Sequence, residues 1–173
     1  ELEIDLNVDE VNKLYSLEKG KINLDDLYFD IDGSIRRNEK DNDINLEITG
    51  QDQDLSSFIQ KLPEEYKSQF NNITAKGRFF VHADISGKFG QESTPHLVAE
   101  FGLERGSIIH NKTSVAIDDV NFEGSFNNGK QNSRESSIIM INNFSAGLRK
   151  GIIRGNFELS NLIKPQIAFV SDC

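Results

Sequence analysis

Hydrophobic and polar residues alternate along most of this chain. In the first run, acidic and amide residues separate Leu2, Ile4, Leu6 and Val8. The same period of two recurs at residues 27–31, 44–48, 79–85, 97–103, 115–117, 120–126, 139–141, 153–159 and 167–169. This spacing places apolar side chains on one face of a strand and polar side chains on the other. The sequence therefore predicts a β-rich fold of about eight strands.

Turn-forming residues separate these stretches. Asp32-Gly33, residues 87–90, Arg105-Gly106 and Asn127-Asn128-Gly129 favour tight turns. Two polar segments, residues 36–43 and 124–137, are interpreted as wider hairpin loops. The strand centres lie roughly 10–18 residues apart, which is typical of antiparallel meanders rather than βαβ units.

One segment has a different period. Between residues 54 and 70, apolar residues occur at every fourth position, namely Phe58, Leu62, Tyr66 and Phe70. This spacing predicts one bent helix or two short ones, with Asp54 as N-cap and Pro63 in the first turn of the second. We expect Phe58 and Phe70 to pack across the end of a sheet. Residues 9–17 are a second helical candidate, with apolar residues at Val11, Leu14 and Tyr15.

Composition excludes several classes of protein. The 28 acidic residues outnumber the 19 basic ones, which gives a net charge of −9 and argues against binding to nucleic acid or to an anionic lipid surface. The single cysteine, Cys173, excludes an intramolecular disulfide and a cysteine-based zinc site. The longest uninterrupted aliphatic run, residues 138–141, is far shorter than the roughly 20 residues of a membrane-spanning helix.

Acidic residues offer one candidate metal site. Asp41, Asp43 and Asn45 have the opening spacing of a calcium-binding loop, but Leu46 occupies the sixth position, where a glycine is needed. Because the alternation at residues 44–48 assigns this segment to a strand, we interpret it as a solvated turn. Further carboxylates lie on polar strand faces or at turns without a pattern that pairs them for acid–base catalysis, namely Asp30, Asp32, Asp52 and Asp54.

The sequence has no recognisable catalytic motif. His82, His96 and His110 lack the HxH and HExxH spacings of metal ligands. There is no GxSxG motif, and the glycines at 87 and 90 connect two strands rather than a strand and a helix, as a phosphate-binding loop would. The sequence therefore predicts neither an enzyme nor a cofactor.

The apolar stripe has two interpretations. A sheet of this size must cover its apolar face, yet the predicted helix is too short to do so. The strands can fold their apolar faces together as a sealed core, in a sandwich or a barrel. Alternatively, they can form a bent trough whose exposed apolar surface binds a lipid or a protein. We therefore predict a mainly β fold, an antiparallel bent sheet in the form of a trough, a sandwich or a part-open barrel, with one or two short helices near residues 54–70.

The order of these elements resembles a known family. The run at residues 54–66 contains an expected short helix that ends in Leu62-Pro63. It is followed by a strand at residues 75–88 that ends in Gly87-Lys88. Strands at residues 95–101 and 103–108 follow, and then the stretch Val115-Ala116-Ile117-Asp118-Asp119-Val120-Asn121-Phe122-Glu123-Gly124. This succession resembles the repeating unit of the AsmA-like proteins of Gram-negative envelopes, which include TamB-type relatives. The resemblance covers residues 54–173, and residues 1–53 are similar to the end of a preceding repeat.

The resemblance implies a non-enzymatic function. AsmA-like proteins are periplasmic, are anchored at the inner membrane by an N-terminal helix, and contribute to phospholipid transport and outer-membrane biogenesis. On this interpretation the chain is a fragment of a longer periplasmic protein, its anchor lies outside the fragment, and its partners are phospholipid or other envelope proteins. The resemblance implies no catalytic, metal or cofactor residues. The expected groove residues are Phe79, Val81, Ala83, Ile85, Leu97, Ala99, Phe101, Leu103, Val115, Ile117, Phe122, Ile139 and Ile141.

Two other functions are compatible with the same sequence. A closed β-sandwich would use the apolar stripe as its core and serve as a structural or adhesive module without a lipid ligand. A carbohydrate-active β-sandwich that uses surface carboxylates is the third. A groove would leave the apolar stripe exposed to solvent, whereas either sandwich would bury it.

Overall fold

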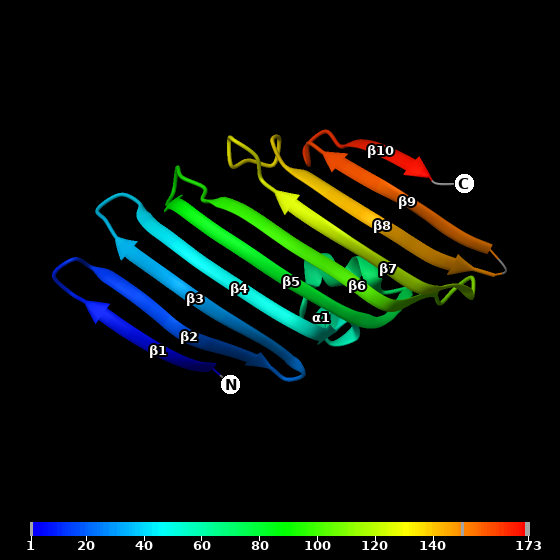
Figure 1. The fold of residues 1–173 in the computed structure, drawn as a ribbon, viewed down its shortest axis with the longest axis horizontal. Coiled ribbons are helices and arrows are strands. Elements are labelled where there is room, and N and C mark those ends of the chain that lie inside the picture. Colours follow the sequence, from blue (N-terminus) through cyan, green and yellow to red (C-terminus); the bar gives the residue numbers. More distant parts are fainter. Residues whose placement is uncertain (1, 150, 172–173) are drawn as a thin grey trace.

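The computed structural model describes residues 2–149 and 151–171, which form a ten-stranded sheet (Figure 1). Its strands are β1 (Leu2–Asp9), β2 (Leu14–Leu24), β3 (Leu27–Arg37), β4 (Asn42–Asp54), β5 (Ile73–Phe89), β6 (His96–His110), β7 (Val115–Asn127), β8 (Ile138–Leu148), β9 (Gly151–Ser160) and β10 (Gln166–Ser171). Each strand pairs antiparallel with its sequence neighbours, so β1 and β10 are the two edges. The prediction of a mainly β, antiparallel fold is confirmed, with two more strands than expected.

The sheet is an open trough. Among the described residues, the extensive contacts between strands are all between neighbours in the sheet, and α1 packs on β4 and β5. The described strands therefore form a single layer. The accessible surface is 12028 Å², whereas a compact protein of 19.5 kDa exposes roughly 8,500 Å². Of the three predicted forms, the structure therefore has the trough and not the sandwich.

Short helices connect β4 to β5, as the sequence predicts. They are α1 (Leu55–Lys61), α2 (Glu64–Lys67) and the 3₁₀ turn η1 (Ser68–Phe70). Asp54 caps α1, because its Oδ1 accepts a hydrogen bond of 2.7 Å from the backbone N–H of Ser57. Pro63 lies between the two helices, and its carbonyl accepts a bond from the N–H of Lys67. These helices lie on one side of the sheet, behind β5 and β6 in Figure 1.

The helical candidate at residues 9–17 is wrong. Asp9 ends β1, and its carboxylate accepts bonds from the backbone N–H and the side-chain amide of Asn12 at 3.0 and 2.7 Å. These bonds hold a turn of the kind that aspartate favours. Leu14 and Tyr15 then begin β2 and pair with β3. The apparent helical spacing therefore arises where a turn interrupts two alternating runs.

Two predicted turns lie inside strands instead. Asp32-Gly33 is in the middle of β3, where a Cβ atom on Gly33 would lie 2.0 Å from the carbonyl oxygen of Asn45 on β4. Glycine at this position thus permits a close approach of two strands, with a φ of +137°. Arg105, with a φ of 51°, forms a bulge in β6 rather than a turn.

Bulges recur across the sheet and bend it. The pairing register shifts between most neighbouring strands, and the extra residues lie in β2, β4, β6, β7 and β8. Several of the extra residues have left-handed backbone angles, namely Lys19, Asp52, Arg105, Asp119 and Asn143. Each bulge adds local twist to its strand. Their repetition at neighbouring positions explains why this long sheet is curved.

The fully buried core is small. Among the residues whose burial is described, the buried apolar side chains are Leu27, Ala75, Leu103, Val120 and Ala146. Three of these form one cluster on β6, β7 and β8, surrounded by half-buried side chains that include Leu55 from α1. Most of the apolar stripe is therefore only partly covered.

Candidate functional site

Strand pairing joins the apolar stripes into one face that extends across the sheet. On β4 to β6, Ile48, Ala83 and Ala99 are directly opposite one another. The same row continues through Phe126, Ile139, Leu159 and Ile167 to the edge at β10. Directly opposed residues share a face of a sheet. The α1 helix lies on this face, which we call the trough face.

The predicted groove residues lie on the trough face, but only some of them form one site. Phe79, Val81, Phe101, Leu103 and Phe122 line a common apolar cavity next to α1. Six others continue the trough face beyond the cavity, namely Ala83, Ile85, Leu97, Ala99, Ile139 and Ile141. Ile117 packs against the buried cluster, and Val115, the first residue of β7, lines a separate hollow.

The apolar cavity measures about 540 Å³. It lies between the trough face and the helical segment, and all sixteen lining residues are nonpolar. Sequence reasoning missed several of them as site residues, namely Phe29, Leu55, Ile59, Ile73, Ala75, Phe80, Gly102 and Ile108. The sequence did carry a signal for some of them. Phe29 lies in the alternating stretch at residues 27–31, and the apolar residues at every fourth position from Phe58 mark one face of the helical segment. That the helix and strand residues meet at one cavity was not predictable, because this contact depends on how α1 folds back over β5.

Packing of α1 onto β5 shapes this cavity. The rings of Phe58 on α1 and Phe79 on β5 have centroids 5.0 Å apart, and Phe58 remains 37% exposed. Phe70 at the end of η1 also lines the cavity. The expectation that Phe58 and Phe70 pack at the sheet is confirmed. Because α1 has seven residues, it covers only part of the trough face.

Several aromatic rings on the trough face lie flat over glycines. Ring atoms of Phe29, Phe101 and Phe169 would lie 2.6–2.7 Å from a Cβ atom built on Gly50, Gly124 and Gly155, respectively. A glycine beneath a ring lets that ring lie along the sheet rather than project from it. These glycines let the three rings approach the backbone of the sheet closely, whereas the ring of Phe122 stands at 81° to that of Phe101.

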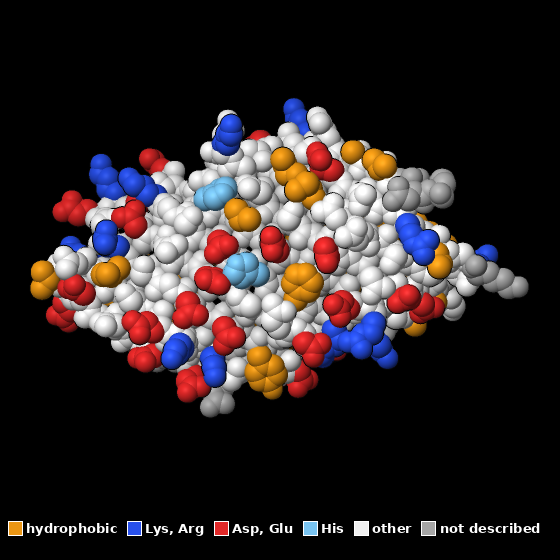
Figure 2. All heavy atoms as spheres, in the orientation of Figure 1, with side chains coloured by type: hydrophobic (Ala, Val, Ile, Leu, Met, Phe, Trp, Pro, Cys, Tyr) orange, Lys and Arg blue, Asp and Glu red, His pale blue; other side chains and the backbone are white. Residues whose placement is uncertain are grey.

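The opposite face is polar. Figure 2 shows acidic, basic and histidine side chains gathered on the side of the sheet that faces away from the helices. His82 lies there within 3.1 Å of Thr49 Oγ1 and within 3.5–3.7 Å of carboxylate oxygens of Asp84 and Glu47. The two faces thus separate apolar from charged surface across a single layer of strands.

Two ion pairs lie beside the helical segment. Lys61 at the end of α1 bonds to Asp25 in the β2–β3 turn, and this hydrogen bond lowers the pKa of the Asp25 carboxyl. Arg78 Nε on β5 lies 2.7 Å from Oδ1 of Asp52, and this hydrogen bond lowers the pKa of Asp52. The first pair joins α1 to the β2–β3 turn and the second joins β4 to β5. Both carboxylates are largely exposed, so each pair contributes little to stability.

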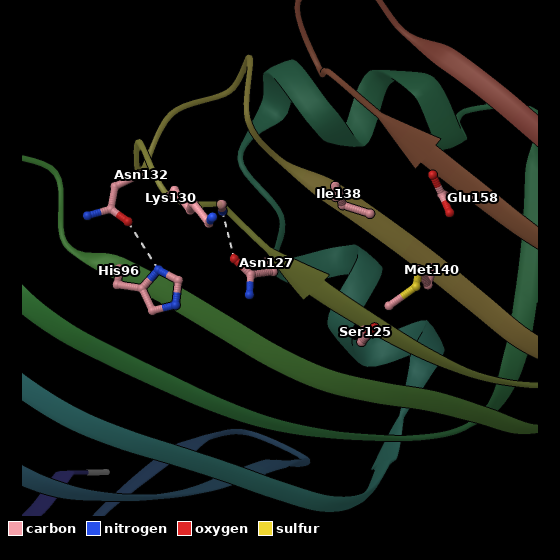
Figure 3. A pocket seen from close by; sticks show the side chains of 9 residues that line it. His96, Ser125, Asn127, Lys130, Asn132, Ile138, Met140 and Glu158 are labelled. Carbon is pink, nitrogen blue, oxygen red and sulfur yellow. Dashed lines mark hydrogen bonds between the residues drawn. The ribbon is translucent and has the colours of Figure 1, made fainter.

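A second hollow, of about 680 Å³, lies on the polar face near the β7–β8 loop (Figure 3). His96 Nδ1 lies 3.0 Å from Oδ1 of Asn132, and Asn127 Oδ1 accepts a bond from the N–H of Gly129. Met140 and Glu158 come from the neighbouring strands β8 and β9. Asn132 Nδ2 also donates to the carbonyl oxygen of Thr94, so the polar groups here tie the β7–β8 loop to β6 and to the loop before it. The apolar cavity is therefore the better candidate site.

The residues considered for a calcium loop, Asp41, Asp43 and Asn45, lie at and just before the start of β4. Asn42 begins β4 and Asp43 pairs with Lys88 on β5. Among the described residues, no group of three or more histidine, cysteine, aspartate or glutamate side chains is placed to hold a metal ion. Of the carboxylates considered for catalysis, Asp52 bonds to Arg78 and Asp54 caps α1.

Within residues 2–149 and 151–171, no helix combines the length and the apolar character needed to cross a bilayer. Comparisons with protein-family models, curated proteins and solved structures give no match for this chain. The candidate site is therefore defined by its geometry, which is an apolar cavity that opens onto a wide apolar face of a single-layer sheet.

Proposed function

We propose that this chain is a non-enzymatic segment that binds the acyl chains of phospholipid along its trough face. The observation that carries the proposal is the 540 Å³ apolar cavity beside α1, which is continuous with the apolar rows of β4 to β10. Exposed apolar surface of this extent usually marks a binding site for a lipid or a protein. An acyl chain matches a long and featureless apolar surface better than a folded partner does.

The energetics favour a flexible apolar ligand. Each methylene group that moves from water into the trough contributes about 0.8 kcal/mol. The cavity that Phe29 and Phe101 line has room for part of such a chain and offers it few polar contacts. The phospholipid headgroup would remain in solvent at the rim, which agrees with the absence of charged side chains among the cavity residues.

The biological setting is part of the same proposal. The order of helix and strands resembles the AsmA-like unit, and an open antiparallel trough is the architecture that this resemblance implies. On this basis we propose that residues 54–173 form one such unit in a periplasmic protein anchored outside this chain, where it supports phospholipid transfer and outer-membrane biogenesis.

A matched pair of variants tests the binding site. Val81 lines the cavity on the trough face of β5, whereas Ile109 lies on the other face of β6 and is 38% exposed. Phospholipid is extracted from each purified protein and detected by mass spectrometry. We expect none from Val81→Asp, because a carboxylate that loses its hydration in the apolar cavity raises the free energy of the bound state. Ile109→Asp should retain the lipid. Equal lipid content in both variants and the wild type would exclude this site.

A further inference from the structure

An aromatic side chain lies on the polar face in the middle of the sheet. Phe80 borders the apolar cavity from within β5, but the alternation of the strand directs its side chain away from the trough, between those of Phe79 and Val81. Its ring lies against Gly102, which is directly opposite on β6, and ring atom Cζ would come within 2.7 Å of a Cβ atom built there. Phe80 thus gives an apolar surface to a face that carries mostly charged and polar side chains (Figure 2).

Two hollows on the polar face meet at this ring. One measures about 430 Å³ and the other about 330 Å³, and both are lined by Phe80 and by Glu123 on β7. The polar residues that line them further include Glu100, Ser125 and Asn142 in the larger hollow and Glu104, Arg105 and Asn143 in the smaller. All of these side chains come from β5, β6, β7 and β8, so the two hollows lie in the interior of the sheet.

The larger hollow adjoins the one near the β7–β8 loop, because Ser125 lines both. The apolar side chains of this third hollow are Ile138 and Met140, which are 38% and 42% exposed on the polar face (Figure 3). Lys130 and Glu158 line it as well. The three hollows thus form a row from β5 to β9, in which apolar surface lies among carboxylate, amide and hydroxyl groups.

Polar side chains along this row have unused hydrogen-bonding capacity. Among the described residues, the side chains of Glu100, Asn142 and Glu158 make no hydrogen bond or ion pair within the protein. Glu123 accepts a long bond of 3.5 Å from Asn143 Nδ2. Carboxylates accept hydrogen bonds, and a side-chain amide both donates and accepts them. The row therefore suits a ligand with many hydroxyl groups.

A sugar combines such hydroxyl groups with a face of C–H bonds that packs on an aromatic ring. Charge narrows the choice of ligand further. Four glutamates line the row against two basic side chains, Arg105 and Lys130, together with His96, which disfavours an anionic polysaccharide. Because Arg105 and Lys130 line the hollows at opposite ends of the row, a basic peptide along its length is disfavoured as well.

We propose that this row of hollows binds an uncharged oligosaccharide of β-1,4-linked sugars, with one ring packed on Phe80 and hydroxyl groups bonded by Glu100, Glu123 and Asn142. Equatorial linkages keep such a chain extended and flat, which matches an open row along the surface of a sheet. The row lies on the face opposite the trough, so this site is separate from the one proposed for phospholipid.

Amide chemical shifts of the ¹⁵N-labelled, delipidated 173-residue protein test this proposal. The probes are the hexasaccharides of β-1,4-linked glucose and of β-1,4-linked N-acetylglucosamine. We expect at least one of them to cause saturable shifts beside the hollows of β5 to β8. Phe80→Ala should raise its dissociation constant at least about tenfold. Tyr28→Ala removes a ring that is 57% exposed on the polar face of β3, outside the row, and should bind as the wild type does.

A second variant leaves the Phe80 ring in place. Glu123→Ala removes the carboxylate that two hollows share and should weaken sugar binding at least about fivefold. Glu47→Ala, on the same face but outside the row, is its control. Thermal unfolding establishes that each variant folds. A wild type that binds neither hexasaccharide would overturn the proposal, and hexalysine binding in their place would assign the row to a basic peptide instead. Sugar binding that is unchanged in Phe80→Ala and Glu123→Ala alike would exclude this site.

This inference does not rest on lipid binding. Glu123 does not line the cavity beside α1, and Val81 does not line the row on the polar face. Glu123→Ala should therefore retain phospholipid, and Val81→Asp should retain the hexasaccharide. Loss of sugar with retained lipid overturns only the oligosaccharide site when it occurs in the wild type, and absence of lipid with retained sugar overturns only the trough.

Discussion

The ring of Phe101 on β6 lies directly over Gly124 on β7, where a Cβ atom would come within 2.6 Å of the ring carbon Cε2. The same arrangement places Phe29 over Gly50 and Phe169 over Gly155. In each case the glycine lies on the strand next to the ring, namely on β4, β7 and β9. The close approach of these rings to the sheet thus depends on glycine.

Gly124→Ala should force the Phe101 ring away from the sheet and into the trough. Because the added methyl group crowds a packed ring, we expect the free energy of unfolding to fall by about 1–3 kcal/mol. Urea unfolding measures this change. Gly151→Ala on β9 is the control, since its nearest neighbour would be 3.7 Å from the new Cβ atom. Equal stability of the two variants would contradict the role assigned to Gly124.

Asp54→Ala should loosen α1. Loss of the hydrogen bond from Ser57 N–H to Asp54 Oδ1 leaves a helix end uncapped, which costs about 1 kcal/mol. Because α1 is short and held to β5 through Phe58, we expect faster amide hydrogen exchange in residues 55–61 and unchanged exchange in β8. Asp54→Asn retains an acceptor and should exchange as the wild type does. Uniformly faster exchange along the whole chain would instead indicate global destabilisation.

Acid stability should depend on Asp52. Its pKa lies below the ordinary value of 3.8 because Arg78 donates a hydrogen bond to its carboxylate. A lowered pKa in the folded state contributes stability that is present above pH 3.8 and is lost as the pH falls through the folded value. Asp52→Asn should therefore show a flatter decline of the urea midpoint below pH 3.8 than the wild type.

The control for this pH dependence is another aspartate in a bulge. Asp119 on β7 has the same left-handed backbone conformation as Asp52, with φ angles of 51° and 52°. Asp119→Asn keeps the residue size and makes the same change of aspartate to asparagine at a bulge, so the acid limb of the Asp52→Asn curve is compared with it. An Asp52→Asn curve that overlays the wild-type curve would show that the Arg78 pair has no part in acid unfolding.

The bulges are held by side chains from the following strand. The backbone N–H of Arg105 donates to Asn121 Oδ1 at 2.9 Å, and the bulges at Lys19 and Asn143 donate in the same way to Asp32 and Asn156. Asn121→Ala should cost about 1 kcal/mol and speed exchange of the Arg105 amide in particular. Asn142→Ala on β8 is the control. Unchanged exchange at Arg105 in the Asn121→Ala protein would exclude this role for the side chain.

The strands were predictable because their signal is local. Alternation at residues 79–85 and 97–103 marks apolar faces directly, and the i+4 stripe with Asp54 identifies the helical segment. Gly33 and Arg105 were misinterpreted as turns because a glycine that permits close strand approach has the same sequence signature as a turn glycine. The bulge at Arg105 depends on Asn121, which lies sixteen residues away.

The site was only partly predictable for a related reason. Sequence pattern assigned Val81 and Phe101 to an apolar face, and the structure places both at the cavity. It gave no means to place Leu55 and Ile59 of α1 over them, because that contact depends on the tertiary path between β4 and β5. Whether the face was sealed or open likewise depended on sheet curvature, which arises from bulges that leave little local signal.

Photocrosslinking with a phospholipid that carries a diazirine in one acyl chain tests the central claim most directly. After delipidated protein is loaded and irradiated, mass spectrometry of its peptides identifies the contact sites. We expect adducts on trough-face residues beside α1, with Phe79, Val81 and Phe101 among them, and none on the polar-face neighbours His82 and Glu100. Adducts spread equally over both faces, or no adducts at all, would contradict a lipid-binding trough.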